Sequence, residues 1–394
     1  MVLRLTGQSI GLALPQNEKA MTEATTESGA VPAVSRALKP TYEGDFVLDR
    51  HLFLESGRTL ANPTLRYAVY GKLNAARDNA VLVCNALSGS ALVGSWWPEI
   101  FAPGAVLSLE QDFVICINML GSCYGSTGPG SLDPETGLVY GPDFPLVSIR
   151  DNVRAQAQLL DSLGIGRLRL VLGGSIGGMQ ALEWAIFDPD RVERAAIIAV
   201  APLSAMGLAL NHLQRQAIQN DPYWDGGYYL PQRQPMAGLS LARQIGMLSY
   251  KSAHLFEERF GRKPNRNGED PWALDHQGGG LLGGRFDIGG YLDHQGERFI
   301  DRFDANAYLA ILRTMDTWDP LHGGNSLEQT YSRITARLTF VGISSDWLFP
   351  AQSVREFAET IRAAGAHADY REMVSTHGHD AFLAEQAELV RLLQ

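Results

Sequence analysis

The chain contains short, continuous apolar runs that alternate with stretches spaced like amphipathic helices. Runs this short and this uniformly apolar are typical of strands that are buried on both faces of a parallel sheet. Residues 149–160 lie between two of these runs and carry apolar side chains at helical spacing. The alternation predicts an α/β protein with a doubly wound, mostly parallel sheet. The apolar runs are residues 80–84, 113–117, 168–172, 195–200 and 337–341.

The alternation stops after Val200 and resumes at Arg337. Between them lie helix-like stretches, such as residues 239–248, and a loop rich in Gly, Asn and Asp at residues 263–284. We therefore expect one α/β core that is interrupted by a mostly helical insertion, which would form a lid. The predicted parts are a flexible N-terminal tail (1–40), the core (41–205 and 328–394) and the helical lid (206–327).

Composition excludes several classes of protein. Of the 394 residues 45% are hydrophobic, which excludes a disordered chain, and the net charge of −10 argues against a nucleic-acid binder. The sequence has no apolar run long enough to cross a membrane. Its three cysteines are too few for a disulfide framework and lack zinc-site spacing, so we expect a cytoplasmic protein with no metal site. These cysteines are Cys84, Cys116 and Cys123.

A Gly-x-Ser-x-Gly motif at residues 173–177 follows one of the apolar runs and precedes a helical stretch. This strand–turn–helix context is the one in which the α/β-hydrolase fold carries its nucleophile. The glycines allow close packing at a sharp turn, and the turn presents Ser175 at a helix N-terminus, where the dipole favours negative charge. The motif predicts that Ser175 is a catalytic nucleophile.

The acid and the base should follow the serine in that chain order. Asp346 lies just after a late predicted strand, where the acid is expected, and Asp369 and Asp380 are the alternatives. Two histidines, His377 and His379, lie between the last strand and the closing helix. The pattern alone does not choose between them as the general base.

An oxyanion hole needs two backbone N–H groups that point at the same oxygen. One is predicted at Ile176, the residue after the nucleophile. The second should come from the loop that follows the strand at residues 80–84, and Leu87 is the predicted donor.

Five segments of the chain carry a family resemblance: residues 118–129, 173–185, 302–309, 346–350 and 378–383. Together they resemble the homoserine O-acetyltransferase family, the acyltransferases of methionine biosynthesis that have the α/β-hydrolase fold. The resemblance extends over roughly residues 42–394 and implies that the base is His379. The family usually has His-Ala-Leu-Thr-Gly where this chain has Asn85-Ala86-Leu87-Ser88-Gly89, and Met where it has Ile176.

The resemblance implies a ping-pong transfer in which Ser175 takes an acyl group from acetyl-CoA or another acyl-CoA. Acyl-CoA would be a cosubstrate, with no cofactor bound permanently. The acceptor would be the hydroxyl of L-homoserine, with Arg215 on its carboxylate and Asp380 on its ammonium group. The resemblance also implies a homodimer that forms through the lid.

Three other functions stay open. The first is transfer to L-serine, with acetyl or succinyl as the acyl group, in cysteine biosynthesis. The second is an esterase or thioesterase, in which water is the acceptor; a lid and an amino-acid clamp argue against it. The third is an inactive binding scaffold, against which the complete Ser175, Asp346 and His379 set argues.

Overall fold

A sheet of eight strands forms the centre of the computed structural model, which describes residues 37–272 and 284–394. The strand order is β1-β4-β6-β5-β7-β8-β9-β10. Pairing is antiparallel between β1 and β4 and between β4 and β6, and parallel in the rest of the sheet. Most of the predicted tail, residues 1–36, lies outside the described residues. The strands are β1 (Tyr42–Val47), β4 (Thr64–Gly71), β5 (Ala80–Cys84), β6 (Phe113–Ile117), β7 (Leu170–Gly174), β8 (Arg194–Ile198), β9 (Arg337–Ile343) and β10 (Ala368–Met373). A separate small hairpin is formed by β2 (Leu52–Phe53) and β3 (Thr59–Leu60).

Strand β7 is shifted by two residues from its predicted position at residues 168–172, because its ladder continues into the glycines of the motif. Gly173 pairs with Cys84 of β5 and Gly174 with Ile198 of β8. Every residue of β5 and of β7 is buried, as expected for central strands of a parallel sheet. The nucleophile therefore follows directly on the end of the most central part of the sheet.

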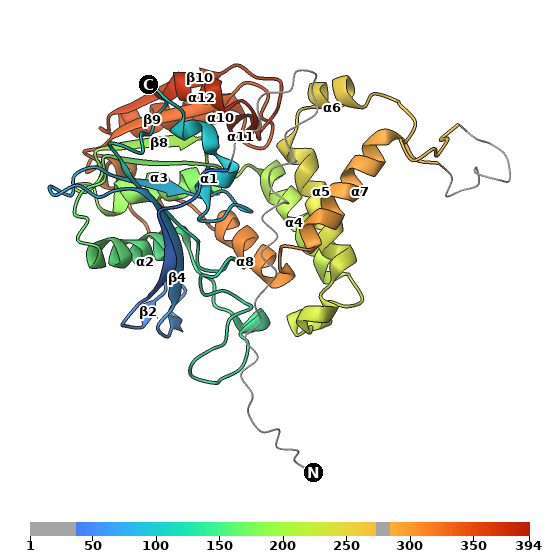
Figure 1. Cartoon of the computed structure of the whole chain (residues 1–394), viewed down its shortest axis with the longest axis horizontal. Coiled ribbons are helices and arrows are strands. Elements are labelled where there is room, and N and C mark those ends of the chain that lie inside the picture. The colour runs from blue at the N-terminus through green and yellow to red at the C-terminus, as the bar shows by residue number, and fades with distance from the viewer. Residues whose placement is uncertain (1–36, 273–283) are drawn as a thin grey trace, which may run out of the picture.

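Helices cover both faces of the sheet and bury two apolar clusters against it (Figure 1). The larger cluster holds side chains of α2, α3 and α10, including Val153, Leu182 and Ile361. The smaller cluster, on the other face, includes Trp97 and Leu389. This arrangement confirms the predicted fold class. The helices are α1 (Val93–Trp96), α2 (Ile149–Ser162), α3 (Ile176–Phe187), α10 (Ala351–Ala363), α11 (Ala381–Ala384) and α12 (Gln386–Leu393), with short 3-10 turns at η2 (Pro98–Phe101) and η3 (Gly141–Asp143).

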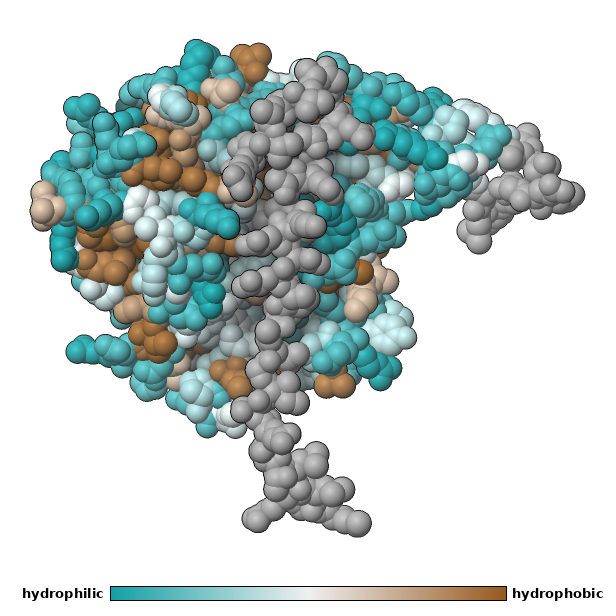
Figure 2. Space-filling model, viewed as in Figure 1, coloured by the Kyte–Doolittle hydropathy of each residue, from teal (hydrophilic) through white to brown (hydrophobic). Residues whose placement is uncertain are grey.

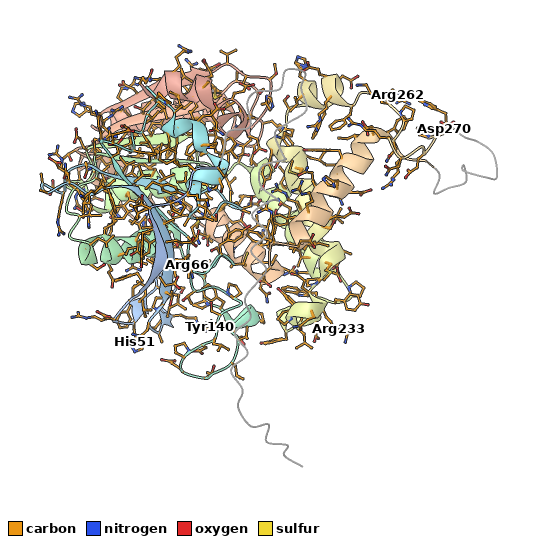
Figure 3. All side chains as sticks on the ribbon, viewed as in Figure 1. His51, Arg66, Tyr140, Arg233, Arg262 and Asp270 are labelled. Carbon is orange, nitrogen blue, oxygen red and sulfur yellow. The ribbon has the colours of Figure 1, made fainter. Side chains whose placement is uncertain are left out.

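Between β8 and β9 the described residues form helices and no named strand, and we call residues 205–331 the helical segment. α4, α5 and α7 lie side by side in it, to one side of the sheet (Figure 1). Arg262 and Asp270 lie at its end far from the sheet (Figure 3). Its elements are α4 (Ala205–Gln219), η4 (Asp225–Gly227), η5 (Pro231–Arg233), α5 (Met236–Tyr250), α6 (Ala253–Arg259), α7 (Asp287–Ile300), α8 (Ala305–Asp316) and α9 (Leu327–Tyr331).

The end of α5 lies against the loops that follow β9 and β10. Trp347 Nε1 donates to the Lys251 carbonyl at 3.0 Å, and the Asp380 N–H donates to the Tyr250 carbonyl at 3.0 Å. Because these loops lie at the carboxyl edge of the sheet, the helical segment covers that edge. The visible face of the molecule is mostly hydrophilic with scattered hydrophobic patches (Figure 2), and no described helix has the length and apolar content to cross a membrane.

Candidate active site

Ser175 occupies a strained turn between β7 and α3. Its backbone has φ 57° and ψ −131°, a conformation that L-residues with a Cβ rarely adopt and that costs about 1–3 kcal/mol. The turn is possible because glycines surround it. A Cβ on Gly173 would lie 2.5 Å from the carbonyl of Gly177, and one on Gly177 would lie 2.3 Å from the carbonyl oxygen of Cys84. The Ser175 N–H donates to the Ile198 carbonyl at 2.9 Å, which ties the turn to β8.

The two predicted oxyanion donors lie on neighbouring loops. β5 and β7 are adjacent parallel strands, so the loop after Cys84 and the turn at Ser175 leave the same edge of the sheet. The close approach of Gly177 to Cys84 holds the first turn of α3 against that loop. Among the described residues, no hydrogen bond engages the N–H group of Leu87 or that of Ile176. Both groups are therefore free to bind an oxygen.

Asp346 and His379 form a buried pair. His379 Nδ1 lies 2.7 Å from Asp346 Oδ2, and the two side chains are 3% and 0% exposed. The other carboxylate oxygen of Asp346 accepts the N–H groups of Leu348 and Phe349, each at 2.9 Å. Asp346 follows β9 and His379 follows β10, so neighbouring parallel strands bring together residues that are 33 positions apart. With both oxygens of Asp346 occupied, the imidazole is held in one orientation.

His377 does not share this position. Its Nδ1 lies 2.8 Å from Glu385 Oε1, and its side chain is 33% exposed. The other acid candidates are also placed differently, because the Asp369 side chain is 84% exposed and Asp380 pairs with Lys251.

The second nitrogen of His379, Nε2, is buried and has no hydrogen-bond partner among the described residues. The imidazole lies among aromatic rings, with centroid distances of 5.4 Å to Phe349, 5.7 Å to Phe382 and 6.0 Å to Tyr250. Phe382 also packs against Gly174, the neighbour of Ser175, so it links the base to the nucleophile turn. The Ser175 hydroxyl is not hydrogen-bonded to Nε2 here, and such bonds often tighten only when substrate is bound.

Two opposing effects act on the pKa of His379. Burial disfavours the imidazolium and lowers its pKa, whereas the charge and hydrogen bond of Asp346 raise it, with a smaller upward contribution from Asp380. The net effect raises the pKa above its ordinary value of about 6.5. The site therefore favours an imidazole that takes up a proton readily when a neighbouring hydroxyl is deprotonated.

Each of the two predicted substrate-binding residues is held by an ion pair. Arg215, on α4, pairs with Asp316, a carboxylate that is 4% exposed and also accepts the Asn211 amide at 2.8 Å. Asp380 Oδ2 lies 3.1 Å from Lys251 Nζ, beside the catalytic histidine candidate. Arg215 thus balances a buried carboxylate of its own chain, while Asp380 stays next to His379.

Comparison with known proteins identifies the relatives of this site. A family model described as alpha/beta hydrolase fold matches residues 79–386. The homoserine O-acetyltransferase of Symbiobacterium thermophilum is 46% identical over 345 residues, which cover 85% of this chain and 88% of that protein. The chain belongs to the homoserine O-acetyltransferase family. The predicted family resemblance and the prediction of an O-acetyltransferase are confirmed at this level.

Solved structures agree with this membership. The crystal structure of homoserine O-acetyltransferase from Bacillus anthracis matches with a TM-score of 0.82 and 26% identity, over 90% of this chain and 97% of that one. The crystal structure of esterase E22 matches with a TM-score of 0.79 and 26% identity, over 90% of this chain and all of that one. The fold of the homoserine O-acetyltransferase family is thus shared with a protein whose name describes a hydrolase.

One cationic residue of this family member was missed by sequence reasoning. The Arg243 guanidinium lies over the rings of Tyr250, at 5.4 Å, and Phe299, at 4.9 Å. No ion pair engages it among the described residues. Since the Tyr250 ring also packs on the imidazole of His379, Tyr250 lies between Arg243 and the proposed base. Arg243 and Tyr250 both lie on α5, and their spacing of seven residues, which places two side chains on one helix face, is the sequence signal that could have found Arg243.

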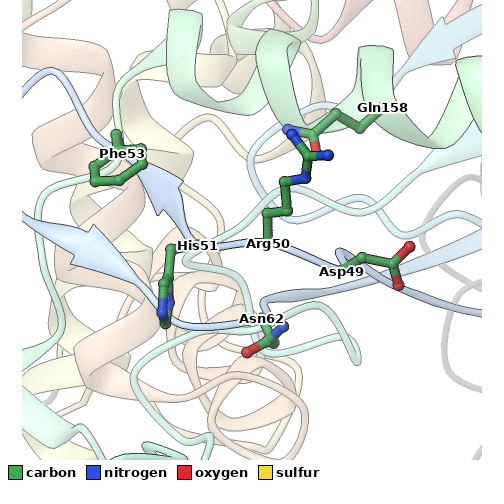
Figure 4. Close-up of a pocket in the computed structure, with 6 residues that line it drawn as sticks. All are labelled: Asp49, Arg50, His51, Phe53, Asn62 and Gln158. Carbon is green, nitrogen blue, oxygen red and sulfur yellow. The ribbon is translucent and has the colours of Figure 1, made fainter.

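A surface pocket lies elsewhere on this family member (Figure 4). Its lining comes from the segment between β1 and β4 and from α2, and none of it belongs to the loops that carry the candidate catalytic residues. The lining residues are Asp49, Arg50, His51, Phe53, Asn62 and Gln158.

Proposed function

We propose that this chain transfers an acetyl group from acetyl-CoA to the hydroxyl of L-homoserine, a reaction of methionine biosynthesis. The observation that carries the proposal is the buried His379–Asp346 pair at the edge of the sheet where Ser175 occupies a strained turn. The name of a relative that is 46% identical supplies the substrate class.

In the first half-reaction His379 Nε2 takes the proton of Ser175 while Oγ attacks the thioester carbonyl. The Leu87 and Ile176 N–H groups would stabilise the negative oxygen of the tetrahedral intermediate. The C–S bond then breaks, the proton passes from His379 to the sulfur, and CoA leaves as the thiol. Ser175 keeps the acetyl group as an ester.

The second half-reaction repeats these steps with another nucleophile. The acceptor hydroxyl gives its proton to His379 and attacks the acetyl ester of Ser175. When the tetrahedral intermediate collapses, the proton returns to Ser175 Oγ, and the acceptor leaves as its O-acetyl ester. Asp346 holds the imidazole in the same tautomer throughout and stabilises the imidazolium in both halves.

Acceptor recognition requires a group for a carboxylate and a group for an ammonium. We propose Arg243 for the carboxylate, because its guanidinium has no ion pair among the described residues and lies over Tyr250, which packs on His379. Arg215 is the alternative, but it would have to leave the buried Asp316 carboxylate. Asp380, next to the base, is proposed for the ammonium, in exchange for or together with Lys251.

Exchanging each arginine separately distinguishes these assignments. Arg243→Gln is expected to raise the KM for homoserine about 10- to 100-fold, the cost of one lost charge-assisted interaction with the carboxylate. Acetylation of the enzyme by acetyl-CoA should change little. Arg215→Gln is the matched control on α4, and its expected effect is a lower melting temperature with the homoserine KM unchanged. The reverse result, with the KM raised only by Arg215→Gln, would restore the sequence-based assignment.

The proposed function is tested by following CoA release from acetyl-CoA or succinyl-CoA with homoserine, with serine, or with no acceptor. Release that requires homoserine and acetyl-CoA supports the proposal, and preference for serine or for succinyl-CoA would support the close alternatives. Equally fast release without an acceptor would mean a thioesterase, the second candidate, which the similarity to esterase E22 favours. No release, and no acyl-enzyme, would leave only a binding scaffold.

A homodimer that forms through the helical segment and a cytoplasmic location stay predictions. We expect the apolar side chains exposed on α4 and α5 to pack against a second copy of the chain. Leu213→Glu combined with Leu241→Glu should then lower the mass measured by light scattering from that of two chains to that of one. Phe53→Glu, at an exposed position on β2, is the control, and a single-chain mass for the unmodified protein would contradict the prediction. The exposed side chains are Met206, Leu208, Leu213, Met236, Leu241 and Leu248.

A further inference from the structure

Arg302 links the helical segment to the loop that carries a proposed oxyanion donor. It lies between α7 and α8, and its Nη1 donates to the Ser88 carbonyl at 3.2 Å and to the Tyr124 hydroxyl at 2.6 Å. Its guanidinium also lies over the Phe299 ring, with 5.0 Å to the centroid. No ion pair engages Arg302 among the described residues, so its donors are directed at neutral oxygens.

The bond to Ser88 acts on a peptide group that is already restrained on its other side. The N–H of the Ser88–Gly89 peptide donates to the Ala86 carbonyl at 2.9 Å, and Arg302 binds the carbonyl of the same peptide. The plane of this peptide is therefore held from both sides, two peptide groups after the one that carries the Leu87 N–H. The Ala86 carbonyl and the Leu87 N–H belong to one planar peptide group, so the bond from Gly89 couples the orientation of the Leu87 N–H to the peptide that Arg302 holds.

The position of Arg302 is itself restrained. Tyr124, which accepts one of its bonds, packs edge-on against Phe303 with centroids 5.6 Å apart. Phe303 is stacked on Phe299 at 4.8 Å, the ring that lies under the guanidinium. A planar guanidinium can stack on a ring and bind two acceptors in one geometry, which a lysine ammonium cannot do.

We infer that Arg302 is a positioning residue for the oxyanion hole, which holds the Leu87 N–H toward the reacting carbonyl from the helical segment. The inference rests on the proposed acyl-enzyme function. Arg302 would contact neither the acyl group nor the acceptor. Its loss should therefore slow both half-reactions, since each passes through a tetrahedral oxyanion, and leave the binding of homoserine unchanged.

The test compares Arg302→Ala, Arg302→Lys and Tyr124→Phe with the unmodified enzyme. Acetylation of Ser175 is measured in single turnovers with acetyl-CoA and, separately, with p-nitrophenyl acetate, which needs the oxyanion hole but offers no CoA to bind. Arg302→Ala is expected to slow acetylation by both donors to the same extent, about 10- to 100-fold. This decrease should not exceed the decrease in rate that follows the removal of a whole oxyanion-hole donor. The KM for homoserine should stay within about twofold.

Rescue separates positioning from a general loss of structure. Added methylguanidinium should partly restore the acetylation rate of Arg302→Ala. Arg302→Lys and Tyr124→Phe should each lower the acetylation rate less than Arg302→Ala does. Arg233→Ala is the matched control, since Arg233 also lies over a ring in the helical segment, that of Tyr223 at 5.7 Å. It should leave both acetylation rates unchanged.

Three outcomes would overturn the inference. A rate that falls with acetyl-CoA but not with p-nitrophenyl acetate would make Arg302 a CoA-binding residue. A raised homoserine KM with normal acetylation would place it in the acceptor site, and a loss that methylguanidinium does not restore would make it structural. If the unmodified enzyme is acetylated only by p-nitrophenyl acetate, acetyl-CoA is not its acyl donor and the proposed function is contradicted. The effect of Arg302 on the oxyanion hole can then still be tested by comparing the variants with p-nitrophenyl acetate.

Discussion

Ser175→Ala is expected to lower acetyl transfer at least about 10⁴-fold, because it removes the hydroxyl that is proposed to form the acyl-enzyme. CoA release from acetyl-CoA in the presence of homoserine measures the rate. Mass spectrometry of the intact protein after exposure to acetyl-CoA without acceptor measures the intermediate. The unmodified chain should gain one acetyl group, and the variant should gain none.

Ser162→Ala is the control for this experiment. The Ser162 hydroxyl donates to the Leu159 carbonyl at 2.7 Å at the end of α2, which leads to the start of β7, whereas Ser175 follows the opposite end of that strand. Its removal should leave both the rate and the acetylated mass unchanged. An acetylated Ser175→Ala protein that still turns over would show that a different nucleophile carries the reaction.

Asp346→Asn is expected to lower kcat about 10⁴-fold through the tautomer of His379. One oxygen of Asp346 accepts two backbone N–H groups, so the asparagine would keep its carbonyl oxygen there and turn its NH₂ group toward His379 Nδ1. Nδ1 would then have to accept a hydrogen bond, which moves the imidazole proton to Nε2. A protonated Nε2 cannot take the proton of Ser175.

The same substitution should shift the pH profile. The base acts only when His379 is neutral, so activity falls as the pH drops through its pKa. Asp346 raises this pKa, and the acid limb of kcat/KM is therefore expected above the ordinary value of about 6.5. In Asp346→Asn burial is no longer opposed by the carboxylate, and the acid limb should move to lower pH.

His377→Asn is the control for the profile, because His377 pairs with Glu385 and not with Asp346. It should leave the acid limb where it is in the unmodified enzyme. The assignment of His379 as the base would be contradicted if the acid limb of the kcat/KM profile shifted in His377→Asn and stayed unchanged in Asp346→Asn.

Much of the fold could be predicted because its signals are local. Apolar runs marked the central strands, and the glycines around Ser175 marked the turn after β7. The two-residue shift of β7 could not be predicted, because whether a glycine continues a strand depends on its partners, here Cys84 and Ile198. The histidine was left open by pattern for a similar reason. His377 and His379 lie two residues apart in the same loop after the last strand. They differ in the carboxylate that the folded chain brings to each, which is Glu385 for His377 and Asp346 for His379.

By itself, the sequence determined the α/β class, the strained turn at Ser175 and the loops on which an acid and a base would lie. These depend on side-chain size, periodicity and glycine content, which act over a few neighbouring residues. Only the tertiary structure decided the partners of the charged groups. Arg215 meets Asp316, whereas Arg243 meets aromatic rings beside His379. The strength of an ionic interaction depends on separation and burial, and both are set by how distant helices and loops pack together.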